Sequence, residues 1–280
     1  MLAGAVLSAT GAGAAGALTL PEATMLVPHR AIYEVELDGA KSSSGVTNLT
    51  GRLVFEFTGS ACDGFTQKMR FVMTITNREG SQTTSDFRSS TWENPEGGRF
   101  KFSINNFEND RQSEATAGDA VREKDEDGQT VRVDLSSPSS DELTFAGNVL
   151  FPVQHTIALL GAARRGEHLL VADLYDGSEQ GGKVFMTSTA IGNARAIASD
   201  AAAGKAANAE RLAGLTAWPV SIAYFDPSSP MKEGIPVHEM SFRFYENGVI
   251  DHLAIDYGSL SVKGVLSSLE FFDRGNCQIQ

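Results

Sequence analysis

The sequence is short of positive charge. It contains 23 lysines and arginines against 35 aspartates and glutamates, which gives a formal net charge of −12 at pH 7. Its densest basic spot is the pair Arg164–Arg165. Nucleic acids and anionic lipid headgroups bind to basic faces, and no stretch of the sequence supplies one. The composition therefore argues against binding to nucleic acid or to an anionic membrane surface.

Long apolar runs are also missing. Residues 1–20 carry no charged side chain but are rich in Ala and Gly, whereas a membrane-spanning helix needs about 20 strongly apolar residues. The stretch is typical of the back half of a secretory signal peptide, with Ala15-Gly16-Ala17 as the cleavage site. No Lys or Arg precedes it, so a disordered N-terminus is the alternative. We expect an exported chain to be soluble after cleavage.

Signatures of catalysis and metal binding are absent as well. The sequence has no G-x-S-x-G, P-loop or G-x-G-x-x-G motif, and its five histidines form no H-x-H or H-x₃-H pair. The acidic stretch 173–179 lacks the spacing of a calcium loop, which favours a polar loop. His252 follows Asp251 in an alternating segment, so we expect their side chains on opposite faces of a strand. We predict no catalytic residue, no metal site and no cofactor.

Alternating apolar and polar residues dominate the chain from His29 onward. In "RLVFEFTG" the residues Leu53, Phe55 and Phe57 share one face, and in "RFVMTITN" the residues Phe71, Met73 and Ile75 do so. The same pattern occurs at Phe100, Phe102 and Ile104. This period of two is typical of antiparallel strands with one buried face.

Turn residues divide the alternating segments into strands. Asn247-Gly248 and Asp127-Gly128 are typical of tight hairpin turns. The pattern predicts about fourteen strands, near residues 29–38, 50–59, 65–77, 81–93, 98–107, 110–117, 119–126, 129–136, 167–174, 182–191, 216–225, 235–245, 248–257 and 259–272. A long antiparallel sheet must hide its edges by closing or curling. We therefore expect a single all-β, barrel-like domain over residues 26–280.

Two stretches depart from the strand pattern. "FPVQHTIALLGAARRG" has Pro152 at a helix start and Gly166 at a helix end, with apolar residues at helical spacing between them. This spacing predicts an amphipathic helix, placed at an opening of the barrel. The Ala-rich stretch 192–215 has Gly204 in its middle and lacks a strong apolar face, which favours a loop with partial helix.

The two cysteines, Cys62 and Cys277, each lie in a turn-like setting rather than inside an apolar run. An even count, a possible signal peptide and the absence of metal spacing favour a disulfide bond between them. Two unrelated buried thiols are the alternative. In the chain-entropy model a bond closing so long a loop would stabilise the fold by up to about 5 kcal/mol.

Several segments together resemble a known family. They are "VPHRAIYEVEL", "TGSACDGF" around Cys62, "FPVQH", "LYDGSEQGGKVFMTSTAIG" and "RGNCQI" near the end. The chain is similar over residues 26–280 to the periplasmic cell-envelope integrity proteins of alphaproteobacteria called EipB. The resemblance implies a β-spiral, an incompletely closed barrel like the lipoprotein carriers LolA and LolB. It also implies a disulfide between Cys62 and Cys277.

The resemblance implies a non-enzymatic periplasmic protein that supports envelope integrity and stress resistance. Members of the family are linked to a periplasmic tetratricopeptide-repeat protein, which is one possible partner. We expect a monomer whose concave face binds a lipid, a lipoprotein or a partner protein, although no ligand-binding residue is assigned. The alternatives are an enzyme acting on envelope glycans or lipids through carboxylates in the cavity, and a purely structural partner-binding protein.

The predicted disulfide can be tested by thiol labelling. We expect neither Cys62 nor Cys277 to react with a maleimide reagent in protein that is unfolded without a reductant, because a disulfide has no thiolate to attack. After reduction both cysteines should react. Two labelled cysteines before reduction, read by mass spectrometry of the intact chain, would contradict the bond.

Overall fold

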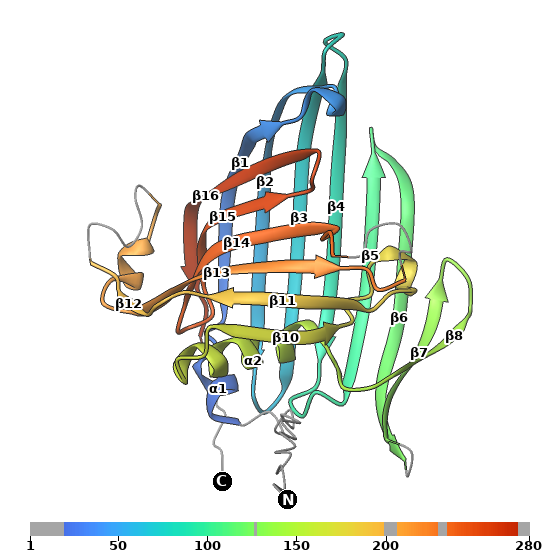
Figure 1. Cartoon of the computed structure of the whole chain (residues 1–280), viewed down its shortest axis with the longest axis vertical. Helices are drawn as coiled ribbons and strands as arrows, with labels where there is room; N and C mark the ends of the chain where they lie inside the picture. Colours follow the sequence, from blue (N-terminus) through green and yellow to red (C-terminus); the bar gives the residue numbers. More distant parts are fainter. Residues whose placement is uncertain (1–19, 126–127, 199–205, 229–233, 274–280) are drawn as a thin grey trace, which may run out of the picture.

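One rolled sheet makes up most of the protein (Figure 1). The computed structural model describes residues 20–125, 128–198, 206–228 and 234–273. Within this described part the sheet has sixteen strands. They are β1 (His29–Ala40), β2 (Val46–Ser60), β3 (Gly64–Asn77), β4 (Gln82–Glu93), β5 (Arg99–Glu108), β6 (Arg111–Asp125), β7 (Gly128–Ser137), β8 (Glu142–Ala146), β9 (Val149–Leu150), β10 (Leu169–Leu174), β11 (Phe185–Ile191), β12 (Arg195–Ala196), β13 (Thr216–Phe225), β14 (His238–Tyr245), β15 (Ile250–Asp256) and β16 (Leu260–Phe271).

The observed strands follow the predicted ones closely, with two kinds of difference. The predicted strands 110–117 and 119–126 are the single strand β6, whose register against β7 shifts at Ala117/Gly118 without ending the pairing. Prediction also missed β8, β9 and β12. Two of these have only two residues each, too few to show an alternation. The all-β, barrel-like prediction is confirmed.

The sheet curls because its first and last long strands pair with each other. β1 pairs with β2 on one side and with β16 on the other, both antiparallel. The strand order is β8-β7-β6-β5-β4-β3-β2-β1-β16-β15-β14-β13-β11-β10-β9. In Figure 1 the strands β10, β11 and β13–β15 run crosswise over the long strands β2–β4. Buried Tyr33 links the two sets, since its hydroxyl donates to the carbonyl oxygen of Ile250 at 2.7 Å.

The two ends of the sheet, β8 and β9, are joined by side-chain packing. The cluster contains Phe100 and Phe102 of β5, residues of β6 and β7, Phe151, and Tyr175 in the loop after β10. Phe100 stacks on Phe151 with ring centres 5.1 Å apart, and Phe102 meets Tyr175 edge-on at 5.7 Å. The seam of the barrel is thus filled by aromatic rings, which bury much apolar area per side chain.

The predicted helix is present as α2 (Pro152–Arg164), and Gly166 follows it at φ +73°. It is buried on more sides than an amphipathic stripe requires, because Leu159 and Ala162 are buried as well as Ile157 and Leu160. A short helix that was not predicted, α1 (Leu20–Met25), packs against it. Within the described residues, no helix has the length and apolarity to cross a bilayer.

The Ala-rich stretch contains β12 and a 3₁₀ turn over Ala209–Leu212 in its described part. The 3₁₀ turn agrees with the predicted partial helix, whereas β12 was not predicted. Residues 199–205 of this stretch lie outside the described residues.

A buried ion pair in β14–β15 corrects the prediction for His252. Asp251 is buried and accepts hydrogen bonds from Arg243 Nε at 2.8 Å and from the Tyr245 hydroxyl at 2.9 Å. His252 Nδ1 lies 2.9 Å from Asp251 Oδ1, so the two side chains do not point to opposite faces. The backbone of His252 is left-handed, with φ +53°, beside a register shift between the strands. This bulge breaks the alternation on which the prediction depended.

Gly177 lies close to the Phe102 ring at the seam, so a methyl group added at Gly177 should lower the stability of the fold. A Cβ on Gly177, which has φ +77°, would lie 2.4 Å from the Phe102 ring. A Cβ on Gly80, with φ +79°, would meet nothing within 4 Å. Both Ala variants carry the same backbone strain, so we expect Gly177→Ala to lower the free energy of unfolding by roughly 1–3 kcal/mol more than Gly80→Ala.

Urea unfolding of the two variants and the wild type measures this difference. Equal losses of stability in Gly177→Ala and Gly80→Ala would show that the seam is not tightly packed at Phe102.

Candidate functional site

A cavity of about 550 Å³ lies inside the roll, and it is the candidate functional site. Its walls come from the long strands β1–β5, from the crosswise strands β13–β15 and from α2. Ligand-binding cavities in proteins commonly measure about 300–1,000 Å³. The interior is therefore open rather than filled by its own side chains, and its size suits a small molecule or the apolar part of a larger one.

Apolar side chains line most of the cavity. The two faces predicted from alternation meet here, since Leu53, Phe55 and Phe57 lie in the lining together with Phe71 and Met73. The lining also contains these further apolar side chains: Leu26, Met69, Phe87, Pro152, Leu159, Leu174, Ile222, Met240, Phe242, Phe244, Ile250, Leu253 and Ile255. Burial of an apolar ligand against such a surface stabilises the complex by roughly 25 cal/mol per Å² of apolar surface removed from water.

Three histidines line the cavity, and burial keeps them neutral. His29 is buried, its Nδ1 lies 2.7 Å from the carbonyl oxygen of Val27, and burial lowers its pKa. Burial lowers the pKa of His155 to about 4, and its Nε2 lies 3.1 Å from the hydroxyl oxygen of Thr187. Burial also lowers the pKa of His238. At pH 7 these rings therefore add polar atoms to the cavity without adding charge.

Four of the polar side chains that line the cavity are here named the rim cluster: Asp176, Tyr224, His238 and Tyr257. Tyr224 and His238 are direct partners on β13 and β14, with ring centres 4.2 Å apart, and Tyr257 follows β15 with its ring 6.3 Å from His238. Tyr224 is 9% exposed and Tyr257 is 42% exposed. The cluster thus spans the change from buried cavity to solvent.

Asp176 is positioned by the loop after β10. Its Oδ1 accepts a hydrogen bond from the Ser178 backbone N–H at 2.9 Å, which holds the carboxylate in a tight turn. Its negative charge adds to burial in raising the pKa of Tyr224, and it opposes the effect of burial on the pKa of His238. The carboxylate and both rings line the same cavity.

A buried carboxyl group anchors the helix that forms one cavity wall. Glu93 at the end of β4 accepts hydrogen bonds from the Val153 N–H at 2.5 Å and from the Gln154 N–H at 3.3 Å. These two donors belong to the first turn of α2, whose N–H groups have no partner inside the helix. Pro152, His155 and Leu159 of the same helix line the cavity. Glu93 therefore holds this wall in place.

Gln154 and Arg122 complete the anchor. The Gln154 side chain donates through Nε2 to the Gly97 carbonyl oxygen at 2.7 Å, and its Oε1 accepts from Arg122 Nη2 at 2.7 Å. Arg122 Nη2 also donates to the Val149 carbonyl oxygen at 2.7 Å. The N-terminus of α2 is in this way tied to β6, to β9 and to the turn between β4 and β5.

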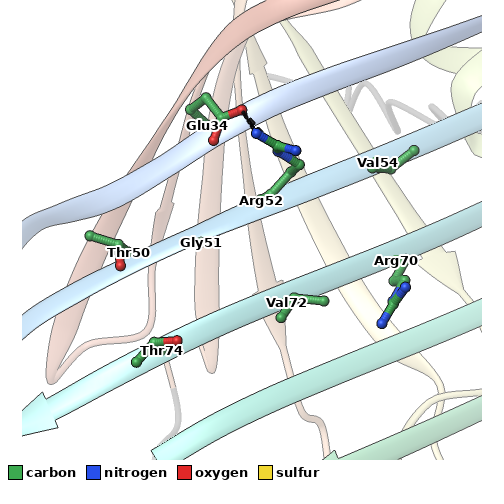
Figure 2. Close-up of a pocket in the computed structure, with 8 residues that line it drawn as sticks. All are labelled: Glu34, Thr50, Gly51, Arg52, Val54, Arg70, Val72 and Thr74. Atoms are coloured by element: carbon green, nitrogen blue, oxygen red, sulfur yellow. Dashed lines mark hydrogen bonds and ion pairs between the residues drawn. The ribbon is translucent and has the colours of Figure 1, made fainter. Parts of the chain in front are cut away.

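A second hollow, of about 460 Å³, lies on the outer face of β1–β3 (Figure 2). Gly51 lies at its floor, where a Cβ would come 2.4 Å from the Val72 carbonyl oxygen. The two arginines that line it are paired within the chain, Arg52 with Glu34 at 2.7 Å and Arg70 with Asp86 at 2.8 Å. Because both cations are already neutralised, this hollow is a weaker candidate for anion binding than its arginines suggest.

The predicted site residues are described only in part. Cys62 is exposed in the turn between β2 and β3, where its N–H donates to the Ser60 hydroxyl oxygen at 3.2 Å. Cys277 lies outside the described residues, so the disulfide stays a prediction. The residues that the structure describes contain no group of three or more metal-ligating side chains.

Sequence reasoning assigned no ligand-binding residue and missed the rim cluster. Its members come from four separate segments, and only the crosswise arrangement of strands brings them together. One local signal was available, because Tyr224 and His238 lie on consecutive strands at positions that pair across a hairpin.

The architecture defines a class: an incompletely closed antiparallel barrel that surrounds an apolar cavity and carries a helix in its wall. A family model described as EipB-like matches residues 21–273, and the chain belongs to this family. The family and the incompletely closed barrel expected from the resemblance are confirmed, whereas the likeness to LolA and LolB stays a prediction.

Two relatives from Brucella abortus show the extent of the similarity. The chain is 38% identical over 266 residues to the cell envelope integrity protein EipB of strain 2308, covering 94% of this chain and 91% of the relative. It is also similar to a crystal structure described as a beta-barrel-like protein of domain of unknown function DUF1849. That match has a TM-score of 0.80 and 35% identity, and covers 89% of this chain and 99% of the other.

The anchor of α2 predicts a pH dependence of stability. Burial raises the pKa of Glu93 from 4.5 to about 8, although its hydrogen bonds with α2 and the charge of Arg122 act against this. The folded state therefore binds the proton more tightly than the unfolded state. The contribution of Glu93 is fully present below pH 4.5 and is lost as pH rises to about 8, on the order of 1 kcal/mol per pH unit.

Glu93→Gln imitates the protonated group and should remove this dependence. We expect the variant to gain stability relative to the wild type between pH 5 and pH 8, as measured by urea unfolding at both values. Glu108→Gln, at an exposed position of β5, is the control and should show no such gain. A wild-type–variant difference that is the same at both pH values would rule out a raised pKa at Glu93.

Proposed function

We propose that this protein supports the integrity of a bacterial cell envelope by holding the apolar part of an amphiphile, such as a lipid or an acylated protein, inside its barrel. The observation that carries the proposal is the cavity of about 550 Å³ lined mainly by Phe, Leu, Ile and Met. The relative from Brucella abortus is named a cell envelope integrity protein, which supports the cellular setting.

The lining suits ligands of variable shape. Met69 and Met73 on β3 and Met240 on β14 contribute flexible, polarisable side chains to the wall. Methionine adapts to irregular apolar partners at low cost because its side chain is unbranched. Such a surface favours binding of acyl chains over recognition of one rigid molecule.

The composition of the lining favours a binding protein over the enzyme that acts through paired carboxylates. Asp176 is the one carboxylate among the described residues that line the cavity. Glycoside hydrolysis in its common form needs two carboxyl groups on either side of the bond that is cleaved. A single carboxylate at the rim does not meet that requirement.

The compartment and the partners belong to the same proposal. We place the mature protein in the periplasm as a monomer, with a disulfide between Cys62 and Cys277. A tetratricopeptide-repeat protein is one partner to test, and it would contact the outer surface rather than the cavity. In the alternative of a purely structural protein, that outer contact alone would carry the function.

Filling the cavity should weaken the binding of an apolar ligand. Met240 lies in the lining on β14, and Met240→Trp would place a larger ring in the space that a ligand needs. Val265 on β16 is 60% exposed, so Val265→Trp adds the same side chain outside the cavity. We expect N-phenyl-1-naphthylamine, a neutral apolar fluorophore, to bind the wild type and Val265→Trp equally and to bind Met240→Trp at least tenfold more weakly.

Fluorescence titration measures these affinities, and circular dichroism checks that each variant is folded. In cells that lack the gene, wild type and Val265→Trp should restore growth on detergent, whereas Met240→Trp should not. A wild-type protein that binds no apolar probe would refute the proposal. Full rescue by a folded Met240→Trp that has lost probe binding would favour the structural alternative.

A further inference from the structure

The cavity has an uneven distribution of charge. None of the described residues that line it is a lysine or an arginine, and its one carboxylate is Asp176 in the rim cluster. The three histidines of the lining are held neutral by burial, which lowers the pKa of each. A ligand in the cavity therefore meets a single fixed charge, which is negative.

Neighbouring charges do not offset Asp176. Lys183 lies on the same loop, but its Nζ is 2.8 Å from Asp226 and 3.4 Å from Glu179, so its charge is already balanced. Asp176 and Glu179 both act to raise the pKa of His238 against the larger effect of burial, as negative charges near the ring do. An anionic group placed here would have no counter-charge and would be repelled.

Asp176 retains a free oxygen for a ligand. Its Oδ1 accepts from the Ser178 N–H at 2.9 Å, whereas its Oδ2 has no hydrogen-bond partner among the residues described. The carboxylate is only partly buried and lines the cavity. It can therefore accept a hydrogen bond or pair with a cation that enters from the apolar side.

Aromatic rings line the cavity together with Asp176. Tyr224 and His238 stack in parallel, with an angle of 19° between their planes, and Tyr257 is tilted by 37° from His238 at the exposed side. The faces of aromatic rings attract ammonium groups, and this attraction is strongest where water is partly excluded. Aromatic rings beside one unopposed carboxylate are a chemistry that favours organic cations.

We propose that the barrel binds amphiphiles with an ammonium head group, the apolar tail lying among the Phe and Met side chains and the head lying against Asp176, Tyr224 and Tyr257. This inference rests on the proposed function and narrows it, because it names the class of ligand. It also states which amphiphiles are rejected: those whose head group is purely anionic, such as fatty acids.

Three probes with the same twelve-carbon chain length test the inference: dodecyltrimethylammonium, dodecyl maltoside and dodecanoate. Each is titrated below its micelle-forming concentration, with displacement of N-phenyl-1-naphthylamine as the readout. We expect the ammonium probe to bind at least tenfold more tightly than dodecanoate, with the neutral maltoside between them. The preference should shrink as salt is added, because exposed charges are screened.

Asp176→Asn should weaken binding of the ammonium probe about tenfold and leave the maltoside within twofold. Asp173→Asn is the matched control, since Asp173 is a nearby exposed carboxylate that does not line the cavity. It should leave the affinities for all three probes unchanged. Tyr257→Leu provides a second test that leaves the Ser178 turn intact, and it should weaken the ammonium probe severalfold.

The outcomes separate the two proposals. If dodecanoate binds as tightly as the ammonium probe, or if folded Asp176→Asn and Tyr257→Leu both bind the ammonium probe like the wild type, the head-group inference is wrong and the apolar cavity keeps its proposed role. If none of the three probes displaces the fluorophore, both proposals fail.

Discussion

The pairing of β1 with β16 is the interaction on which the rest of the structure depends. A long antiparallel sheet exposes unpaired N–H and C=O groups at its edges, and these edges attract other chains. Here the first and last long strands satisfy each other along most of their length. The remaining ends, β8 and β9, are short and meet through Phe100, Phe151 and Tyr175. The backbone hydrogen bonds between β1 and β16 thus curl the sheet, and aromatic packing closes the seam between β8 and β9.

Because the sheet curls, its apolar face encloses a cavity. Strands from the first third of the chain face strands from the last third, and their apolar sides form opposite walls. Because the sheet is wide, these walls meet fully at the seam and stay apart in the centre. The same alternation therefore produces a packed core at Phe100 and Phe102 and an open lining at Phe55 and Phe71. The cavity lies where the walls fail to meet.

Much of this fold was predictable from local pattern, and the site was not. Alternation placed Phe71 and Met73 on one buried face because period two is a property of consecutive residues. Whether a buried face packs or lines a cavity depends on the distance to the opposite wall, which no local pattern contains. Glu93 illustrates the same limit, since its role depends on α2, which begins some sixty residues later. The bulge at His252 shows that one left-handed residue overrides alternation.

The cavity walls come from segments that are far apart in the sequence, and this separation affects how the chain folds. Tyr33 and Ile250 line one cavity and are joined by a hydrogen bond, yet they lie 217 positions apart. Pairings between such distant segments slow folding, because the chain must close a very long loop before it gains the contact. A chain that lacks β15 is missing Ile250, Leu253 and Ile255 from the cavity wall. The enclosed cavity therefore forms late in folding, and a chain truncated before β15 would leave its apolar lining exposed.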